Sequence, residues 1–223
     1  MIPRVLEPEV MDSVEEAVDY DSMDHSHVNR VFVDDLLAAR ERGQWSHECS
    51  TVLDVGTGTA QIPITLCAGS QQWQVTAIDL AQHMLRVGEK NVVAAGLQQW
   101  IQLESVDAKQ LTYADQQFDC VMSNSIIHHI PEPGQVLAEM WRVLRDDGLL
   151  FVRDLMRPAD SGTLDSLVAQ YAGDENAHQQ QMFRDSLHAA LTLDEVAELL
   201  RTCGLPASWV SQTTDRHWTI CNV

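Results

Sequence analysis

Basic residues are scarce in this chain of 223 amino acids. Fourteen lysines and arginines stand against 33 aspartates and glutamates, which gives a formal net charge of −19. A surface of that charge repels a phosphate backbone, so we do not expect nucleic acid as a partner. We interpret the negative charge as serving solubility, and attraction of a cationic ligand is the alternative interpretation.

Long apolar runs are missing too. No stretch approaches the roughly 20 apolar residues that a membrane span needs, and residues 1–16 lack the basic start and apolar middle of a signal peptide. The length and the 45% of hydrophobic residues are typical of one folded domain. We therefore expect a single cytoplasmic domain over residues 1–223 with no integral membrane part, while the oligomeric state stays open.

Cysteine pairs of the zinc or redox type are also lacking. The five cysteines are odd in number and far apart, and none forms a C-x-x-C pair. No H-E-x-x-H motif or cysteine–histidine cluster accompanies them. We expect reduced thiols, mostly in the core, and no bound metal. The cysteines are Cys49, Cys67, Cys120, Cys203 and Cys221.

Short apolar runs alternate with helical patterns along the middle of the chain, which predicts βαβ units and a parallel sheet. Apolar side chains at helical spacing over residues 137–144 indicate a helix that packs on this sheet. A second helix is indicated near residues 192–203, between Thr192 with Glu195 and the terminating Gly204. The expected strands cover residues 51–55, 73–78, 100–106, 118–122 and 149–152, followed by a hairpin from 207–211 and 218–223.

The predicted fold is α/β: a Rossmann-like, doubly wound, seven-stranded and mostly parallel sheet with an antiparallel last strand. Residues 48–155 form its core in this prediction. Residues 1–47 add an N-terminal lid, with an amphipathic helix carrying Val28, Val31, Phe32 and Leu36. Residues 156–191 add a helical cap after the fifth strand, and residues 192–223 form the last helix and the hairpin.

A glycine turn follows the first strand and is the strongest functional signal. Asp54 ends the strand, and Gly56 and Gly58 allow positive φ and a close approach of backbone to ligand. Such turns bind nucleotides. A dinucleotide fingerprint of the form G-x-G-x-x-G/A would need glycine or alanine at position 61, where this chain has Gln61. The spacing therefore argues against NAD.

Two further acids end neighbouring strands. Asp79 follows the second strand, 21 residues after Gly58, and is placed to accept hydrogen bonds from both hydroxyls of a ribose. Asp107 follows the third strand and could accept from an adenine amino group. Either acid alone could simply cap the next helix, but three acids in register with the turn favour a nucleoside ligand.

This pattern resembles the class I S-adenosylmethionine (SAM) methyltransferases over about residues 50–155. In that family the turn faces the methionine part of SAM, the second acid holds the ribose and the third meets the adenine. The resemblance implies SAM as the cofactor and a small molecule as the methyl acceptor. It implies SAM contacts from Tyr20, Asp54, Gly56, Thr57, Gly58, Asp79, Leu80, Met84, Asp107, Ala108 and Asn124.

Within the family, the chain is most similar to the branch of the ubiquinone and menaquinone biosynthesis C-methyltransferases. Tyr20–Met23 resembles the Y-D-x-M element of that branch, and Arg142–Gly148 resembles its R-V-L-K-P-G-G helix end. Residues 123–131 depart from its Arg-Asn pair, so the resemblance is used for cofactor and reaction only. They also lack the N/D-P-P-Y motif of DNA amino methylation.

His128 and His129 follow the fourth strand, at the edge where open α/β sheets bind ligands. Histidine titrates near neutrality, so either residue could take a proton from the acceptor. The alternative is that one caps the helix near Glu132 and the other packs against the cofactor. Arg153, Arg157 and Phe183 are candidate substrate contacts, although such residues are more often surface or ion-paired.

Three functions are weighed on this basis. SAM-dependent methyl transfer to a small molecule is favoured by the acids, the turn and the histidines. An NAD-dependent oxidoreductase is disfavoured by Gln61. A SAM-binding protein without transferase activity stays open, because binding motifs and catalytic residues are separate.

Overall fold

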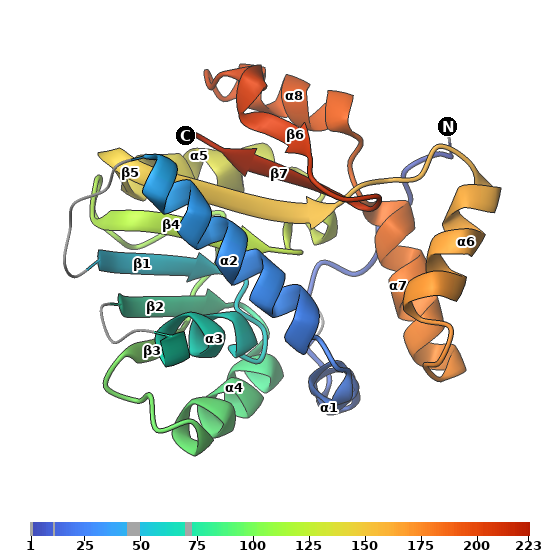
Figure 1. The fold of residues 1–223 in the computed structure, drawn as a ribbon, viewed down its shortest axis with the longest axis horizontal. Coiled ribbons are helices and arrows are strands. Elements are labelled where there is room, and N and C mark those ends of the chain that lie inside the picture. The colour runs from blue at the N-terminus through green and yellow to red at the C-terminus, as the bar shows by residue number, and fades with distance from the viewer. Residues whose placement is uncertain (1, 11, 44–49, 70–72) are drawn as a thin grey trace. The chain divides into compact units, whose positions relative to one another are not determined.

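The strands of the computed structural model form one seven-stranded sheet with the order β3-β2-β1-β4-β5-β7-β6 (Figure 1). The structure describes residues 2–10, 12–43, 50–69 and 73–223, so Cys49 lies outside the described residues. The strands are β1 (Ser50–Val55), β2 (Trp73–Asp79), β3 (Ile101–Ser105), β4 (Phe118–Asn124), β5 (Leu144–Leu155), β6 (Val210–Gln212) and β7 (His217–Cys221). β1 pairs in parallel with β2 and β4, β2 pairs in parallel with β3, and β6 and β7 form an antiparallel hairpin. The α/β fold prediction is confirmed.

The helices follow the predicted pattern over most of the chain. They are α1 (Val14–Ser22), α2 (Ser26–Arg42), α3 (Gln61–Gly69), α4 (Gln82–Ala94), α5 (Gly134–Val143), α6 (Ser161–Tyr171), α7 (Ala177–Ala189) and α8 (Leu193–Thr202). Thr192 and Glu195 form the expected capping box of α8, and Gly204 follows with a φ of 74°. The insertion between Pro158 and Leu191 is helical, as α6 and α7.

Three local predictions were wrong or incomplete. Residues 207–209 form a short 3₁₀ helix, η2 (Ala207–Trp209), where a strand was expected. The fifth strand begins at Leu144 rather than at residue 149, so it takes over the end of the expected helix. α1 was not expected, although Ser13 and Glu16 form a complete capping box at its start.

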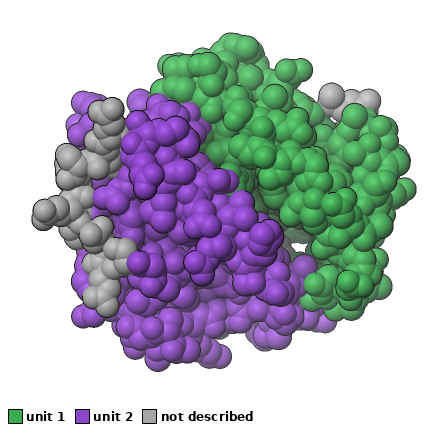
Figure 2. Space-filling view, viewed as in Figure 1, with its two compact units in different colours: residues 1–9, 125–134, 153–220 green, residues 10–124, 135–152, 221–223 purple. Residues whose placement is uncertain are grey.

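The described residues divide into two compact units (Figure 2). Unit 2 comprises residues 10–124, 135–152 and 221–223, and unit 1 comprises residues 1–9, 125–134 and 153–220. The core of unit 2 joins Val52 of β1 and alternate residues of β2 and β4 to α2, and the Phe32 and Phe151 rings pack edge to face with their centroids 5.2 Å apart. The core of unit 1 joins α6 and α7 through Leu164, Leu167 and Leu187. That the chain is one domain stays a prediction.

Candidate functional site

The glycine turn of unit 2 rests on the end of β2. Gly56 and Gly58 have φ values of 76° and 56°, which favour glycine. The backbone N–H groups of Gly56 and Thr57 both donate to the Ile78 carbonyl, at 2.9 Å each. The turn is therefore tied to the strand that carries the second acid.

Asp79 links this turn to the start of α4. Its Oδ2 accepts a hydrogen bond from the Gly58 N–H, and its Oδ1 accepts one from the Ala81 N–H, both at 2.8 Å. Each carboxylate oxygen can accept a further hydrogen bond, so the side chain keeps acceptor capacity for ligand hydroxyls. Burial is the main reason that the pKa of Asp79 lies above its usual value.

Within the described ranges of the chain, Asp54 Oδ2 on β1 and Asn124 Oδ1 on β4 are buried at the same strand ends and have no hydrogen-bond partner. Burial, followed by the negative charge of Asp79, raises the pKa of Asp54 to about 7. Buried polar groups in folded proteins are normally hydrogen-bonded. Unpartnered acceptors beside a glycine turn therefore fit a polar ligand that carries hydrogen-bond donors, as the methionine end of SAM does.

The N-terminal helices are fastened to the glycine turn by side-chain hydrogen bonds. Gln61 Nε2 donates to Asp21 Oδ1 at 3.2 Å, and Gln61 Oε1 accepts from Asn29 Nδ2 at 3.1 Å. A Cβ added to Gly58 would lie 3.7 Å from Tyr20 Cε1, so the Tyr20 ring borders the turn. Gln61, whose position in the turn argues against NAD, thus links α1 and α2 to the start of α3.

The remaining predicted SAM contacts lie along α4 and after β3. Met84 is buried and packs with Ala17 of α1. Leu80 is 41% exposed at the end of β2. Asp107 accepts a hydrogen bond from the Lys109 N–H at 2.9 Å, and the adjacent Ala108 is buried. Their roles in cofactor binding stay predictions.

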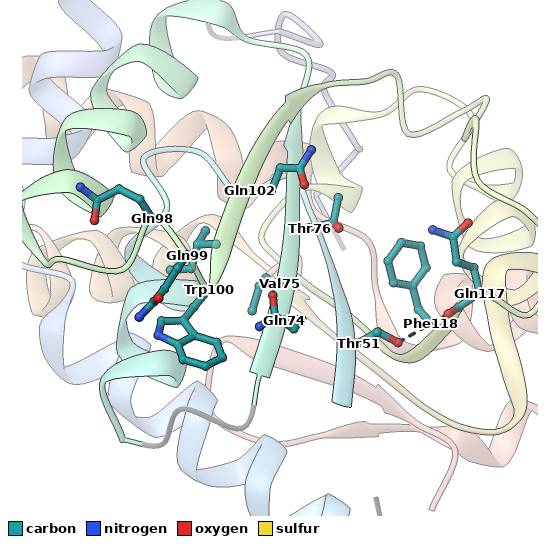
Figure 3. A pocket seen from close by; sticks show the side chains of 11 residues that line it. Thr51, Gln74, Val75, Thr76, Gln98, Gln99, Trp100, Gln102, Gln117 and Phe118 are labelled. Atoms are coloured by element: carbon teal, nitrogen blue, oxygen red, sulfur yellow. Dashed lines mark hydrogen bonds between the residues drawn. The ribbon is translucent and has the colours of Figure 1, made fainter. Parts of the chain in front are cut away.

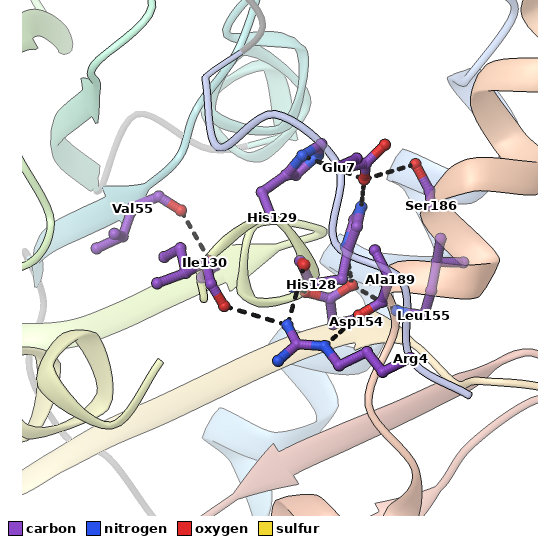
Figure 4. A network of polar contacts seen from close by, with 11 residues as sticks. Arg4, Glu7, Val55, His128, His129, Ile130, Asp154, Leu155, Ser186 and Ala189 are labelled. Atoms are coloured by element: carbon purple, nitrogen blue, oxygen red, sulfur yellow. Dashed lines mark hydrogen bonds and ion pairs between the residues drawn. The ribbon is translucent and has the colours of Figure 1, made fainter. Parts of the chain in front are cut away.

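A cluster of two histidines and two carboxylates lies within unit 1 (Figure 4). His128 and His129 belong to a 3₁₀ helix, η1 (Ile127–His129), which the sequence analysis did not predict. His128 Nδ1 lies 2.5 Å from Asp154 Oδ1, and His128 Nε2 lies 3.4 Å from Glu7 Oε1. His129 Nδ1 lies 3.2 Å from the same Glu7 oxygen. The structure thus brings both predicted histidines together with two acids that were not assigned a role.

Glu7 reaches this cluster because the N-terminal segment is fixed along α7 and η1. Arg4 Nε donates to the Ala189 carbonyl at 2.7 Å, and Arg4 Nη2 donates to the carbonyls of His128 and Ile130. Ser186 Oγ donates to Glu7 Oε1 at 3.2 Å. Sequence reasoning missed Glu7, because no local pattern pairs it with residues so far along the chain.

The two histidines have opposite electrostatic environments. Burial opposes the charged form of His128, but Asp154 and then Glu7 outweigh it, so the pKa of His128 is raised. Burial and the neighbouring His128 lower the pKa of His129 to about 3. The imidazole of His128 therefore holds a proton more firmly than that of His129.

The three predicted substrate residues all have partners inside unit 1. Arg153 Nε donates to Thr219 Oγ1 at 3.0 Å, and Arg157 donates to the Ala190 carbonyl and pairs with Glu195. Phe183 packs against the core of unit 1. Their contact with a substrate stays a prediction.

A pocket is found at the amino ends of β1 to β4, the opposite ends of these strands from Asp54 and Asp79 (Figure 3). Its lining is mostly threonine and glutamine side chains with Trp100 and Phe118. It contains none of the residues predicted to bind cofactor or substrate, so we do not assign it to the site.

Comparison with known proteins agrees with the class that this fold and turn define. Residues 53–152 match the family described as "Methyltransferase domain". The matched segment runs from β1 into β5 and contains Asp54, the glycine turn, Asp79 and Asp107. Residues 53–152 of this chain therefore resemble the methyltransferase domain family on a Rossmann-like fold, as the sequence predicted.

The relatives are named for different methyl acceptors. The demethylmenaquinone methyltransferase of Lactobacillus johnsonii is 34% identical over 109 residues, which are 48% of this chain and 45% of that protein. The 27-O-demethylrifamycin SV methyltransferase of Amycolatopsis mediterranei is 30% identical over 172 residues, 75% of this chain and 59% of that protein. The chain thus spans about half the length of these relatives.

A solved structure shares the fold over nearly the whole chain. It is a SAM-dependent methyltransferase from Aquifex aeolicus, with a TM-score of 0.66, 18% identity, and coverage of 94% of this chain and 97% of that one. Separately, a search of the described residues finds no helix long and apolar enough to cross a membrane.

Proposed function

We propose that the chain is a SAM-dependent methyltransferase that acts on a small molecule. The observation that carries the proposal is the arrangement at the ends of β1 and β2. A positive-φ glycine turn is bonded to Asp79, and unpartnered acceptors of Asp54 and Asn124 lie buried beside it. The match of residues 53–152 to the methyltransferase domain supports the same assignment.

In this proposal the residues of unit 2 bind and orient the cofactor. Asp79 accepts from the ribose hydroxyls, Asp107 accepts from the adenine amino group, and Asp54 faces the ammonium group of the methionine part. When bound, SAM supplies a methyl group made electrophilic by its sulfonium. The chain itself contributes mainly orientation and exclusion of water, because the transfer is an in-line displacement.

His128 and His129 are the residues that we propose to act on the acceptor. Their cluster with Glu7 and Asp154 offers polar groups able to hold an acceptor oxygen or nitrogen and to receive its proton. Two relatives are named for demethylmenaquinone and for 27-O-demethylrifamycin SV, which suggests a quinone and a hydroxyl-bearing small molecule as the first acceptors to try. The acceptor's identity depends on pocket shape, which no motif in this chain reports.

The test is a screen for formation of S-adenosylhomocysteine from SAM with quinols, phenols, amines and thiols. We expect at least one acceptor to be turned over, and Asp79→Ala to lose that turnover at low SAM concentration. The exposed Asp34→Ala serves as the matched control and should behave as the unmodified chain does. SAM binding without turnover on the whole panel would favour a non-catalytic SAM-binding protein instead.

A further inference from the structure

Three potential metal ligands converge within unit 1. Glu7 Oε1, His128 Nε2 and His129 Nδ1 all lie within 4.8 Å of one another (Figure 4). In the part of the chain that the structure describes, this is the one set of three histidine, cysteine or acidic side chains gathered in this way. Unlike the exposed acidic groups common on protein surfaces, these side chains are at most 14% exposed.

The hydrogen bonds of His128 leave its Nε2 facing Glu7. Asp154 Oδ1 lies 2.5 Å from His128 Nδ1, and Asp154 also accepts the backbone N–H groups of His128 and Leu155. Asp154 accepts these three hydrogen bonds, so Nδ1 is the donating nitrogen of the His128 ring. Nε2 is left as the second ring nitrogen, 3.4 Å from Glu7 Oε1, and can act as a metal ligand in the neutral ring.

His129 brings a second imidazole nitrogen, Nδ1, close to the same oxygen. Its ring is hydrogen-bonded to the backbone of Pro8, and proline offers only a carbonyl oxygen, so the imidazole is the donor. Nδ1 has no hydrogen-bond partner, although it lies 3.2 Å from Glu7 Oε1. The donating nitrogen is therefore Nε2, which leaves Nδ1 available as a metal ligand beside Glu7.

Two imidazole nitrogens and one carboxylate oxygen gathered this closely are ligand atoms of the types that zinc prefers. We propose that Glu7, His128 and His129 bind a divalent metal ion of the zinc type. Ligand bonds of about 2.0–2.1 Å in a tetrahedron place neighbouring ligand atoms roughly 3.3 Å apart. The two measured separations from Glu7 Oε1, 3.4 and 3.2 Å, agree with that spacing.

The groups around these three ligands match those of known metal sites. Ligating histidines usually donate their other N–H to a carboxylate or a backbone carbonyl, which fixes the ring. His128 has Asp154 in that role, and His129 has Pro8. Ser186 Oγ donates to Glu7 Oε1. Asp154 is thus a positioning residue that acts through His128.

Three protein ligands leave a fourth position for water or for an oxygen of a small molecule, as in catalytic zinc sites. That this oxygen belongs to the methyl acceptor rests on the proposed function, but the metal site itself does not.

The experiment is a zinc titration of the full chain after removal of metal with a chelator, without SAM, followed by competition with a chromophoric chelator. Cobalt(II) provides a second probe through its visible absorption, which reports tetrahedral nitrogen and oxygen ligation. Glu7→Gln and His129→Gln test the ligands. The exposed Glu9→Gln and His27→Gln are the matched controls, and thermal unfolding checks that every variant folds.

We expect one zinc ion per chain for the unmodified protein and for both controls. Asp154→Asn removes a group that only positions a ligand, so it should weaken zinc binding by roughly 10- to 100-fold. Glu7→Gln and His129→Gln remove ligands themselves and should weaken zinc binding by more than about 100-fold. Absence of stoichiometric binding in the unmodified chain would overturn the proposal. So would equal zinc affinity in the ligand variants and the controls. Neither result bears on SAM binding, which is measured separately on metal-free protein.

Discussion

At the scale of single residues, Asp54 couples stability to ligand binding. Its pKa is about 7 in the folded chain against 3.8 as the ordinary value, because the carboxyl is buried and lies near Asp79. Between these values the folded state keeps a proton that the unfolded state has released. Raising the pH therefore favours unfolding across this window.

We predict that Asp54 lowers the free energy of unfolding of the ligand-free chain as the pH rises from about 4 to 7, so the stability of Asp54→Asn relative to the unmodified chain should increase across this range. At pH 8 the variant should be more stable than the unmodified chain by about 0.5–2 kcal/mol, in the range of other substitutions that relieve a functional strain. Urea unfolding at several pH values measures this, with Asp34→Asn as control. Parallel pH profiles for the variant and the unmodified chain would refute the role of Asp54.

The same titration should appear in cofactor binding. If the ionised form of Asp54 faces the ammonium group of SAM, affinity should fall about tenfold for each pH unit below 7. Calorimetry in buffers with different ionisation enthalpies detects the accompanying proton release. SAM affinity that is flat from pH 5 to pH 8 would exclude this contact.

Asp79 is the residue whose loss should weaken SAM binding most directly. We predict a cost of about 1–3 kcal/mol for Asp79→Ala, the usual penalty for leaving buried hydrogen-bonding groups unpaired. Because Asp79 also holds the Gly58 and Ala81 N–H groups, Asp79→Asn is made in parallel to keep the shape of the side chain. Unchanged SAM affinity in both variants would show that Asp79 does not bind the ribose hydroxyls of SAM.

Substitution of the two histidines should affect turnover but not SAM affinity. His128→Ala and His129→Ala are expected to leave SAM affinity nearly intact and to lower turnover by roughly 100-fold or more in at least one of them. Steady-state kinetics with an acceptor from the screen gives the values. If neither variant is slower, orientation alone accounts for the reaction.

At the scale of elements, α1 is the segment that we expect to respond to the cofactor. It packs on α4 through Ala17 and Met84, and its Tyr20 ring borders the glycine turn. We predict slower hydrogen exchange with SAM over residues 12–26, and over part of 158–191, because both were predicted to cover the site. The last helix, α8, serves as the internal reference. Identical exchange with and without SAM would argue against a lid.

At the scale of the whole molecule, the elements and site residues that could be predicted from the sequence are those that a local sequence pattern determines. Parallel strands bring their carboxyl ends to one sheet edge, so the acids after β1 and β2 could be placed beside the glycine turn. The capping box of Ser13 and Glu16 is also a local pattern that predicts a helix start. We did not predict α1, because the segment is mostly polar. The strand expected at residues 207–209 failed because short β-prone runs also suit a 3₁₀ turn.

Long-range pairing could not be predicted. The sequence contains no zinc motif, and the approach of Glu7 to His128 and His129 depends on contacts of Arg4 and Ser186 that form only in the folded chain. Arg153 and Arg157 were candidate substrate contacts in the sequence, and in the structure they donate hydrogen bonds to Thr219 Oγ1 and the Ala190 carbonyl within unit 1. A single sequence gives no sign of such partners.

The central claim is that the turn between β1 and α3 binds SAM. The most direct measurement is calorimetric titration of the purified chain with SAM, S-adenosylhomocysteine and NAD in parallel. Micromolar binding of both adenosyl ligands, with none for NAD, is the result that the geometry of Asp54, Gly58 and Asp79 predicts. Binding of NAD alone would contradict the claim, and the histidines would then have to be considered as acids for hydride transfer.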